Sequence, residues 1–169
     1  MSGTAPFRVL FVCTGNTCRS PLAEAIARRE FARVATAFLV GSAGTSAEDG
    51  TCASAGSQEV AREHGLDLEA FASRRLTAEH LAAADCVLVM EPVHRSGVLG
   101  VSPQADTKTH LLGELAGRSG REAPVPDPFG GPIESYRRTY EKIQTFIRDA
   151  TPRLVEMAAR RAESGEGDA

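Results

Sequence analysis

The sequence predicts an α/β fold in which helices cover both faces of a parallel sheet. Short apolar runs rich in β-branched residues alternate along the chain with segments of helical pattern, and this alternation is typical of parallel sheets. The 169 residues, 42% of them hydrophobic, are enough for one core, and neither a repeat nor a linker divides them. We expect one domain over residues 1–161 and a disordered tail over residues 162–169.

The first element is a buried strand over residues 7–12, which have the sequence FRVLFV. A polar turn that contains a glycine follows it. A helix is expected next, with Ser20 as its cap, Pro21 in its first turn and Glu24 as an acid near its positive end. The apolar face of this helix carries Leu22, Ile26 and Phe31.

The alternation continues towards the C-terminal end. Further strands are expected at residues 37–41, 85–90 and 108–112, helices at 53–64, 77–84 and 134–161, and a helix or turn at 92–99. Gly65 is expected to end the first of these helices, Thr77 to cap the second, and Pro152 to kink or break the last. Ligands bind beyond the carboxyl ends of the strands in such sheets, so the turn at Cys13 and the loop at residues 41–46 are candidate positions for a site.

Composition and charge exclude several functional classes. A net charge of −3 argues against a nucleic-acid partner, which usually calls for a basic face. The N-terminal region lacks the pattern of a signal peptide or a membrane span, so we expect a cytoplasmic protein with no membrane partner.

Four cysteines in a reducing compartment argue against a disulfide framework, and the spacing of Cys13 and Cys18 matches no common zinc site. We therefore expect neither a metal nor a cofactor, and a monomer rather than an oligomer.

The stretch from Cys13 to Ser20 carries the residue types that phosphate chemistry needs. A turn between a strand and a helix N-terminus gathers backbone N–H groups and the positive end of the helix dipole, which suits a tetrahedral oxyanion. Arg19 adds a planar fork for two phosphate oxygens, and Gly15 permits unusual dihedral angles and a close backbone approach. The same field favours the thiolate of Cys13, to which the Ser20 hydroxyl can donate. These features predict a nucleophile beneath a bound phosphoryl group.

These residues also have simpler interpretations. Cys13 could be a structural thiol beside a surface arginine, but the strand before it and the helix after it favour a reactive one. Cys86 lies inside an apolar strand and is expected to be an inert core thiol, while Cys52 in a loop receives no role. A cysteinyl-phosphate route needs an acid and then a base, and Asp127 stands out because two prolines fix its loop. Spacing alone leaves open whether Asp127 is only a turn residue.

Three motifs resemble those of the low-molecular-weight protein-tyrosine-phosphatase family. Residues 12–21 (VCTGNTCRSP) resemble its phosphate loop, residues 42–45 (SAGT) its second loop, and residues 127–129 (DPF) its acid loop. The resemblance spans residues 7–158. It implies a single-domain, three-layer flavodoxin-like fold around a four-stranded parallel sheet. It also implies a hydrolase that acts on phosphorylated proteins through a cysteinyl-phosphate intermediate.

The resemblance implies roles for individual residues. The implied catalytic set is Cys13 as nucleophile, Arg19 as phosphate clamp and Asp127 as acid and then base. Asn16 is implied to hold the loop in shape, Ser20 to support the thiolate, and Cys18 to trap oxidised Cys13 as a reversible disulfide. The candidate phosphate and substrate contacts are Thr14, Gly15, Asn16, Thr17, Cys18 and Ser20.

Several departures from the family pattern concern the substrate. Thr17 stands where tyrosine-specific members usually carry a larger aliphatic residue. Residues 47–49 lack an aromatic residue that these members often carry there, and Gly130 stands where they usually carry a second aromatic residue. A phosphotyrosine ring needs apolar walls, and only 5% of the chain is aromatic. Thr17 with residues 129–131 (FGG) resembles the protein-arginine-phosphatase branch instead, since a small hydroxyl leaves room for a guanidinium and can bond to it. Elsewhere, Phe71 lies near where many members carry a loop-supporting histidine.

Four functional hypotheses remain at this point. The first is a phosphatase that acts on phosphoarginine in proteins, and the second is the same enzyme acting on phosphotyrosine. An arsenate reductase would need a relay of nearby cysteines, and Cys86 has no partner within ten residues. A non-catalytic phosphate-binding module would keep the loop and lack turnover.

Overall fold

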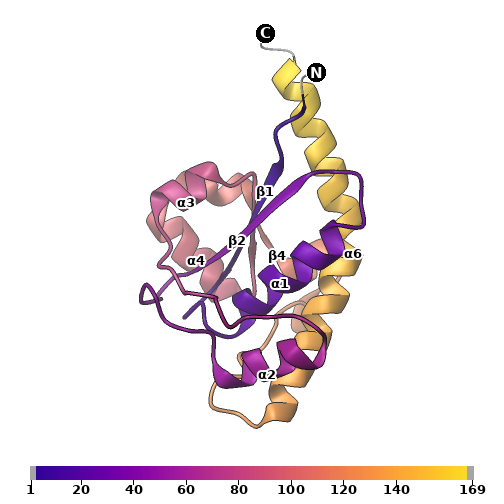
Figure 1. Ribbon diagram of the computed structural model, residues 1–169. Coiled ribbons are helices and arrows are strands. Elements are labelled where there is room, and N and C mark those ends of the chain that lie inside the picture. Colours follow the sequence, from indigo (N-terminus) through magenta and orange to yellow (C-terminus); the bar gives the residue numbers. More distant parts are fainter. Residues whose placement is uncertain (1–2, 167–169) are drawn as a thin grey trace.

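A four-stranded parallel sheet forms the centre of the computed structural model, which describes residues 3–166 (Figure 1). Its strands are β1 (Phe7–Cys13), β2 (Phe38–Gly44), β3 (Cys86–Val89) and β4 (Thr109–Leu111), in the order β2-β1-β3-β4. All neighbouring strands are parallel. The prediction of a four-stranded parallel sheet is therefore confirmed.

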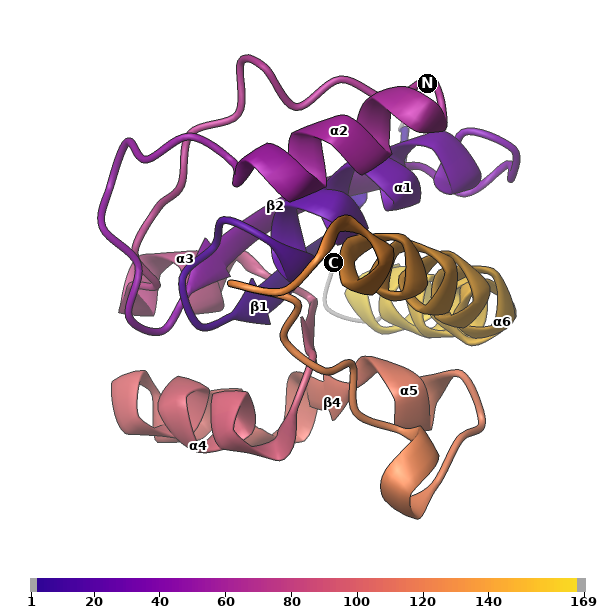
Figure 2. The same ribbon diagram turned by 90° about the horizontal axis from the view of Figure 1, so that it is seen from below.

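Helices cover both faces of this sheet. They are α1 (Arg19–Phe31), α2 (Ala55–Glu63), α3 (Ala78–Ala83), α4 (Pro92–Val101), α5 (Leu112–Leu115) and α6 (Ile133–Glu166), with 3-10 turns at Pro103–Lys108 and Gly120–Glu122. Figure 2 shows α1 and α2 on one side of the sheet and α4 on the other. The three layers give the flavodoxin-like fold. Within residues 3–166, none of the helices combines the length and apolarity needed to cross a membrane.

The central strand β1 explains why both faces need cover. Successive side chains of a strand point to opposite faces of the sheet. Val9 and Phe11 belong to the core beneath α1 and α6, whereas Leu10 and Val12 belong to the core beneath α3 and α4. All four are buried, and each such burial stabilises the fold by roughly 1.5–3 kcal/mol.

The strand register brings the carboxyl ends of three strands to one edge. Cys13 at the end of β1 pairs with Gly44, and Val12 pairs with Val89. β2 stays in this register to Gly44 and so is longer than the predicted strand at residues 37–41. The segments that follow β1, β2 and β3 meet at this edge, where ligands bind in open parallel sheets.

The start of α1 differs from the prediction in its cap. The apolar face is buried as expected, but the N-cap position belongs to Cys18, whose side chain accepts no capping hydrogen bond. Ser20 lies inside the helix, so its prediction as cap is wrong. Its hydroxyl is instead within hydrogen-bond distance of Cys13 and Asn16. Other predicted end signals are confirmed, since Thr77 caps α3 and Gly65 follows α2 with a left-handed φ of 72°.

The C-terminal helix is longer than predicted at its end. α6 continues through Pro152 without a break and past Arg161 to Glu166. Ile147 and Leu154, before and after the proline, are both buried, so packing against the core holds the helix together across it. Residues 162–166 are therefore helical rather than part of a disordered tail, and residues 167–169 of that predicted tail lie outside the described residues.

Candidate active site

The loop from Cys13 to Arg19 joins the end of β1 to the start of α1 and faces a cavity of about 370 Å³. The loop contributes Cys13, Thr14, Gly15, Thr17, Cys18 and Arg19 to the cavity wall, and other segments contribute Ser46, Ala47, Glu48, Thr51, Asp127 and Phe129. The structure thus brings the three predicted catalytic residues together at one cavity. Asp127 thus lines the same cavity as Cys13, and its role as acid and base stays a prediction.

Cys13 lies at the floor of this cavity and is 2% exposed. Its Sγ is 2.9 Å from Ser20 Oγ, and the first turn of α1 lies directly after the loop. Backbone N–H groups at a helix N-terminus and a hydroxyl donor both stabilise an anion. These surroundings suit an anionic sulfur, so the nucleophilic role of Cys13 stays a prediction that the geometry allows.

Asn16 carries the backbone strain of the loop. It has a left-handed φ of 55°, the only such value at a non-glycine among residues 3–166, and it is fully buried. Its Nδ2 donates to Ser20 Oγ at 2.7 Å and to Ser42 Oγ at 3.0 Å, while its Oδ1 accepts from the Arg74 N–H at 2.9 Å. Gly15 has no left-handed φ, so the expectation of unusual dihedral angles there is wrong. An asparagine tolerates that conformation because its side chain bonds locally.

The second loop binds the phosphate loop through its backbone. Thr45 N–H donates to the Cys13 carbonyl and Ser46 N–H to the Thr14 carbonyl, both at 2.9 Å. Gly44 lies so close that a Cβ atom there would be 2.5 Å from the Thr14 oxygen and 2.9 Å from the Asn16 nitrogen. Only glycine fits at this contact, so the end of β2 sets the shape of the phosphate loop.

Arg19 is 2% exposed, is held by two hydrogen-bond acceptors and forms an ion pair with a third group. Its Nη1 donates to the Glu91 carboxylate and to the Val125 carbonyl, the latter at 2.9 Å, and its Nη2 is 3.6 Å from Asp127 Oδ2. Its buried Nε finds no acceptor among residues 3–166. An unpaired buried donor is costly, and an oxyanion in the cavity would satisfy it. The guanidinium is thus already oriented by protein groups and keeps a donor free for a ligand.

His94 supports the loop from the first turn of α4. Its Nδ1 accepts from the Glu91 N–H at 3.0 Å, which leaves Nε2 to donate to Thr14 Oγ1 at 2.9 Å. Burial, and then the nearby Arg19 cation, lower the pKa of His94 from 6.5 to about 4. The imidazole is therefore neutral at physiological pH, in the form that this pair of hydrogen bonds requires.

The other cysteines have different surroundings. Cys18 Sγ donates to Ser54 Oγ at 3.2 Å and lies 3.9 Å from Tyr136 Oη, and burial together with Cys18 raises the pKa of Tyr136. Burial raises the pKa of Cys86 to about 12, which agrees with the predicted inert core thiol. Cys52 is exposed, and Cys13 and Cys18 are both free thiols.

Several residues of the site were not identified from the sequence. They are Glu24, Ser42, Glu91, His94 and Tyr136. Glu91 and His94 follow a strand that neighbours β1, and this position at the carboxyl edge was the available signal. Glu24 had been assigned only to the helix dipole. Phe71, which lies near where the family resemblance implies a loop-supporting histidine, packs against the core, and the loop is bonded through Asn16 to Ser42 and to the Arg74 N–H.

Comparison with known proteins agrees with this geometry. The family model described as low molecular weight phosphotyrosine protein phosphatase matches residues 8–160. The chain belongs to this family. Among curated members it is 39% identical to a protein-arginine-phosphatase of Geobacillus stearothermophilus, over 84% of this chain and 92% of that protein. It is 33% identical to the low molecular weight protein-tyrosine-phosphatase Etp of Escherichia coli K12, over 86% and 93% of the two chains.

Solved structures of the family share the fold. The YwlE arginine phosphatase from Geobacillus stearothermophilus superposes with a TM-score of 0.81 at 36% identity, covering 92% of this chain and 97% of that one. The relatives thus include phosphatases named for arginine and for tyrosine. Which of the two substrates fits this family member depends on the walls of its own cavity.

Proposed function

We propose that this chain is a cysteine-dependent protein phosphatase that hydrolyses phosphoarginine. The observation that carries the proposal is the composition of the cavity that contains Cys13 and Arg19, because Thr17, Glu48 and Asp127 are among its lining residues. Hydroxyl and carboxylate groups suit a guanidinium, which donates several hydrogen bonds, better than an aromatic ring, which needs apolar walls. The similarity to a relative named as a protein-arginine-phosphatase supports the same substrate.

The proposed reaction has two steps. The Cys13 thiolate attacks phosphorus, the P–N bond breaks, and the protonated Asp127 gives its proton to the leaving guanidine nitrogen. The Asp127 carboxylate then takes a proton from water, which attacks the phosphocysteine and breaks the P–S bond to release inorganic phosphate. The backbone N–H groups of residues 14–19 and the Arg19 guanidinium hold the phosphoryl oxygens in both steps.

Known structures and the present geometry support the covalent route. A cysteine-to-serine mutant of the YwlE arginine phosphatase, with a TM-score of 0.84 and 32% identity to this chain, carries a phosphorylated active-site serine. In this chain the matching nucleophile is Cys13, whose sulfur lies beside the Ser20 hydroxyl and near the N-terminal end of the α1 dipole. An arsenate reductase is disfavoured, because fully buried Cys86 cannot serve an outward cysteine relay.

One observation favours phosphotyrosine as a second candidate substrate. Phe129 is 73% exposed and lines the same cavity as Asp127, so its ring offers one apolar wall. Gly130 and Gly131, which follow it, offer no second aromatic ring. One wall stabilises a ring less than two, so phosphoarginine remains the favoured substrate.

The proposal includes the setting of the enzyme. Its substrates are phosphorylated proteins, and it works as a monomer in the cytoplasm without a cofactor. The free thiols of Cys13 and Cys18 are consistent with a reducing compartment. Cys18 is proposed to form a reversible disulfide with oxidised Cys13 under oxidising conditions.

A paired-substrate assay tests the proposal. One peptide sequence is prepared with phosphoarginine and with phosphotyrosine at the same position, and kcat/KM is measured for both. We expect the phosphoarginine peptide to be the better substrate, and we expect Cys13→Ser to abolish turnover of both. An equal or higher kcat/KM for phosphotyrosine would contradict the arginine assignment, and turnover by Cys13→Ser would contradict the covalent mechanism.

A further inference from the structure

A chain of hydrogen bonds runs from the nucleophile to a carboxylate outside the cavity. Cys13 Sγ is 2.9 Å from Ser20 Oγ, and Asn16 Nδ2 bridges Ser20 Oγ and Ser42 Oγ. Ser42 Oγ in turn donates to Glu24 Oε2 at 2.5 Å. Glu24 lies on α1 and does not line the cavity that contains Cys13. Its side chain is 13% exposed, and its Oε1 is 2.6 Å from Arg28 Nη2.

We propose that Glu24 is a positioning residue for the nucleophile, because its carboxylate fixes the direction of this hydrogen-bond chain so that the Ser20 hydrogen points at Cys13. The proposal rests on the cysteine-dependent reaction proposed above and adds a residue that acts on it from a distance. It concerns the thiolate itself and is independent of which phosphorylated side chain is the substrate.

The direction follows from counting donors and acceptors. A carboxylate only accepts, so the single hydrogen of Ser42 goes to Glu24, and the Ser42 oxygen can then only accept. The Asn16 amide supplies both of its Nδ2 hydrogens, one to Ser42 and one to Ser20. Ser20 Oγ therefore accepts from Asn16, and its own hydrogen remains for the sulfur of Cys13.

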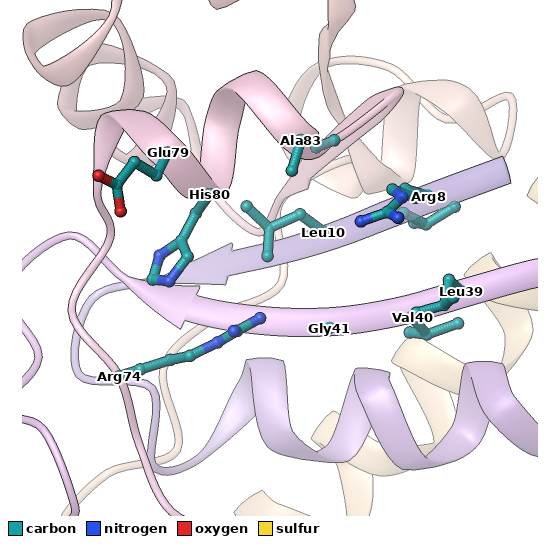
Figure 3. Close-up of a pocket in the computed structure, with 11 residues that line it drawn as sticks. Arg8, Leu10, Leu39, Val40, Gly41, Arg74, Glu79, His80 and Ala83 are labelled. Atoms are coloured by element: carbon teal, nitrogen blue, oxygen red, sulfur yellow. The ribbon is translucent and has the colours of Figure 1, made fainter. Parts of the chain in front are cut away.

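Arg74 fixes the other end of the Asn16 amide. Its backbone N–H donates to Asn16 Oδ1 at 2.9 Å, and its side-chain Nε donates to the Ser42 carbonyl at 2.8 Å. Figure 3 shows the Arg74 side chain beside β2 near Gly41, where a Cβ atom would lie 2.6 Å from Arg74 Nη2. With Oδ1 facing a donor on one side and Nδ2 facing Ser42 on the other, the amide has one favourable orientation.

Removal of the Glu24 carboxylate would make a second orientation of the Asn16 amide available. In Glu24→Gln, the Arg28 guanidinium attracts the new amide oxygen, so the amide nitrogen faces Ser42 and donates to it. The Ser42 hydrogen is then free to compete with the Arg74 N–H for Asn16 Oδ1. In the molecules whose Asn16 amide rotates, the amide oxygen would draw the Ser20 hydrogen away from Cys13. The thiolate would lose a hydrogen bond while the backbone of the phosphate loop stays in place.

The test is the pH dependence of Cys13 alkylation by iodoacetamide in the full-length protein, followed on the Cys13 peptide by mass spectrometry. We expect Glu24→Gln to raise the midpoint of the profile by about one unit, which is tenfold less thiolate below both midpoints. The charged and titratable groups that line the cavity with Cys13 are Cys18, Arg19, Glu48 and Asp127, and all are unchanged in this variant, as is His94, which bonds to Thr14. Glu141→Gln, an exposed position on α6 with the same charge change, is the matched control.

Two further variants separate the proposed role from a merely structural one. Ser42→Ala should raise the midpoint to a similar extent, which keeps the test valid if Glu24→Gln does not fold. In a Ser20→Ala background, Glu24→Gln should not shift the midpoint further, because the hydrogen bond between residue 20 and the Cys13 sulfur is already absent. A midpoint that matches the Glu141→Gln control, or a full additional shift in the Ser20→Ala background, would overturn the proposal. Alkylation needs no substrate, so absence of turnover in the wild type would contradict the proposed function alone.

Discussion

The phosphate loop is supported from two flanks that differ in chemistry. On the β2 flank, neutral hydrogen bonds lead from Ser20 through Asn16 to Ser42 and end on Glu24. On the α4 flank, Glu91 pairs directly with Arg19, and a neutral histidine in the same turn donates to the first residue after the nucleophile. The β2 flank therefore contacts the site at the sulfur of Cys13, and the α4 flank contacts it at Arg19 and Thr14.

This difference suggests that the two flanks control different properties of the site. Changes on the β2 flank should alter the reactivity of Cys13, whereas changes on the α4 flank should alter how an oxyanion is held. The two effects are separable in experiment, because alkylation reports on the thiol and inhibition by vanadate reports on the oxyanion site. The variants below test that separation.

Arg19→Lys should give the largest effect on the α4 flank. A lysine keeps the charge and loses the planar fork held between Glu91 and the Val125 carbonyl. We expect kcat/KM for an aryl phosphate to fall by about 10²–10³-fold and vanadate inhibition to weaken. Arg95→Lys, on α4 next to His94 and paired with Asp106, should keep the wild-type rate. A comparable loss in that control would show that any arginine change on this flank is harmful.

His94→Gln should change how stability depends on pH. The pKa of His94 is about 4 in the folded protein against an ordinary value of 6.5, so the unfolded chain takes up the proton first as pH falls. Stability is therefore lost between these two values in the wild type, by roughly 2 kcal/mol between about pH 7 and pH 4.5. Urea unfolding at both pH values should show a smaller loss in His94→Gln. Equal losses in the two proteins would mean that the fold does not lower the pKa of His94.

Thr17→Ile belongs to neither flank and should have the smallest effect. An aliphatic side chain adds an apolar wall and removes a hydroxyl from the cavity. We expect the ratio of kcat/KM for phosphotyrosine to that for phosphoarginine to rise about tenfold. The alkylation profile of Cys13 should be unchanged. A shift in that profile would mean that the side chain at position 17 also influences the reactivity of the Cys13 thiol.

The sequence predicted most of the sheet and the centre of the site, because these depend on contiguous residues. Cys13, Arg19 and Ser20 lie within one strand-turn-helix unit, where the pattern alone indicates the local geometry. Asp127 stood out because two prolines fix its loop, but its role was implied only by family resemblance, since spacing does not bring it to Cys13.

The sequence analysis placed residues 42–45 at the site, but the side-chain contacts of both supporting flanks escaped it for a physical reason. Ser42 meets Asn16 only through the register of β1 with β2, and Glu91 meets Arg19 only because β3 lies beside β1. Strand order and register are tertiary properties that hydrophobic pattern does not specify. The same limit explains the error at Gly15, because the left-handed residue of the loop is set by the bonds that Asn16 makes to other segments.

A rapid-quench experiment tests the central claim most directly. The enzyme is mixed with a phosphoarginine peptide and quenched within the first turnover, and its own peptides are analysed for a phosphoryl group. We predict phosphorylated Cys13, and longer persistence of it in Asp127→Asn, in which water has no base. An unmodified Cys13 with the phosphoarginine peptide, together with a modified Cys13 from the matched phosphotyrosine peptide, would contradict the account.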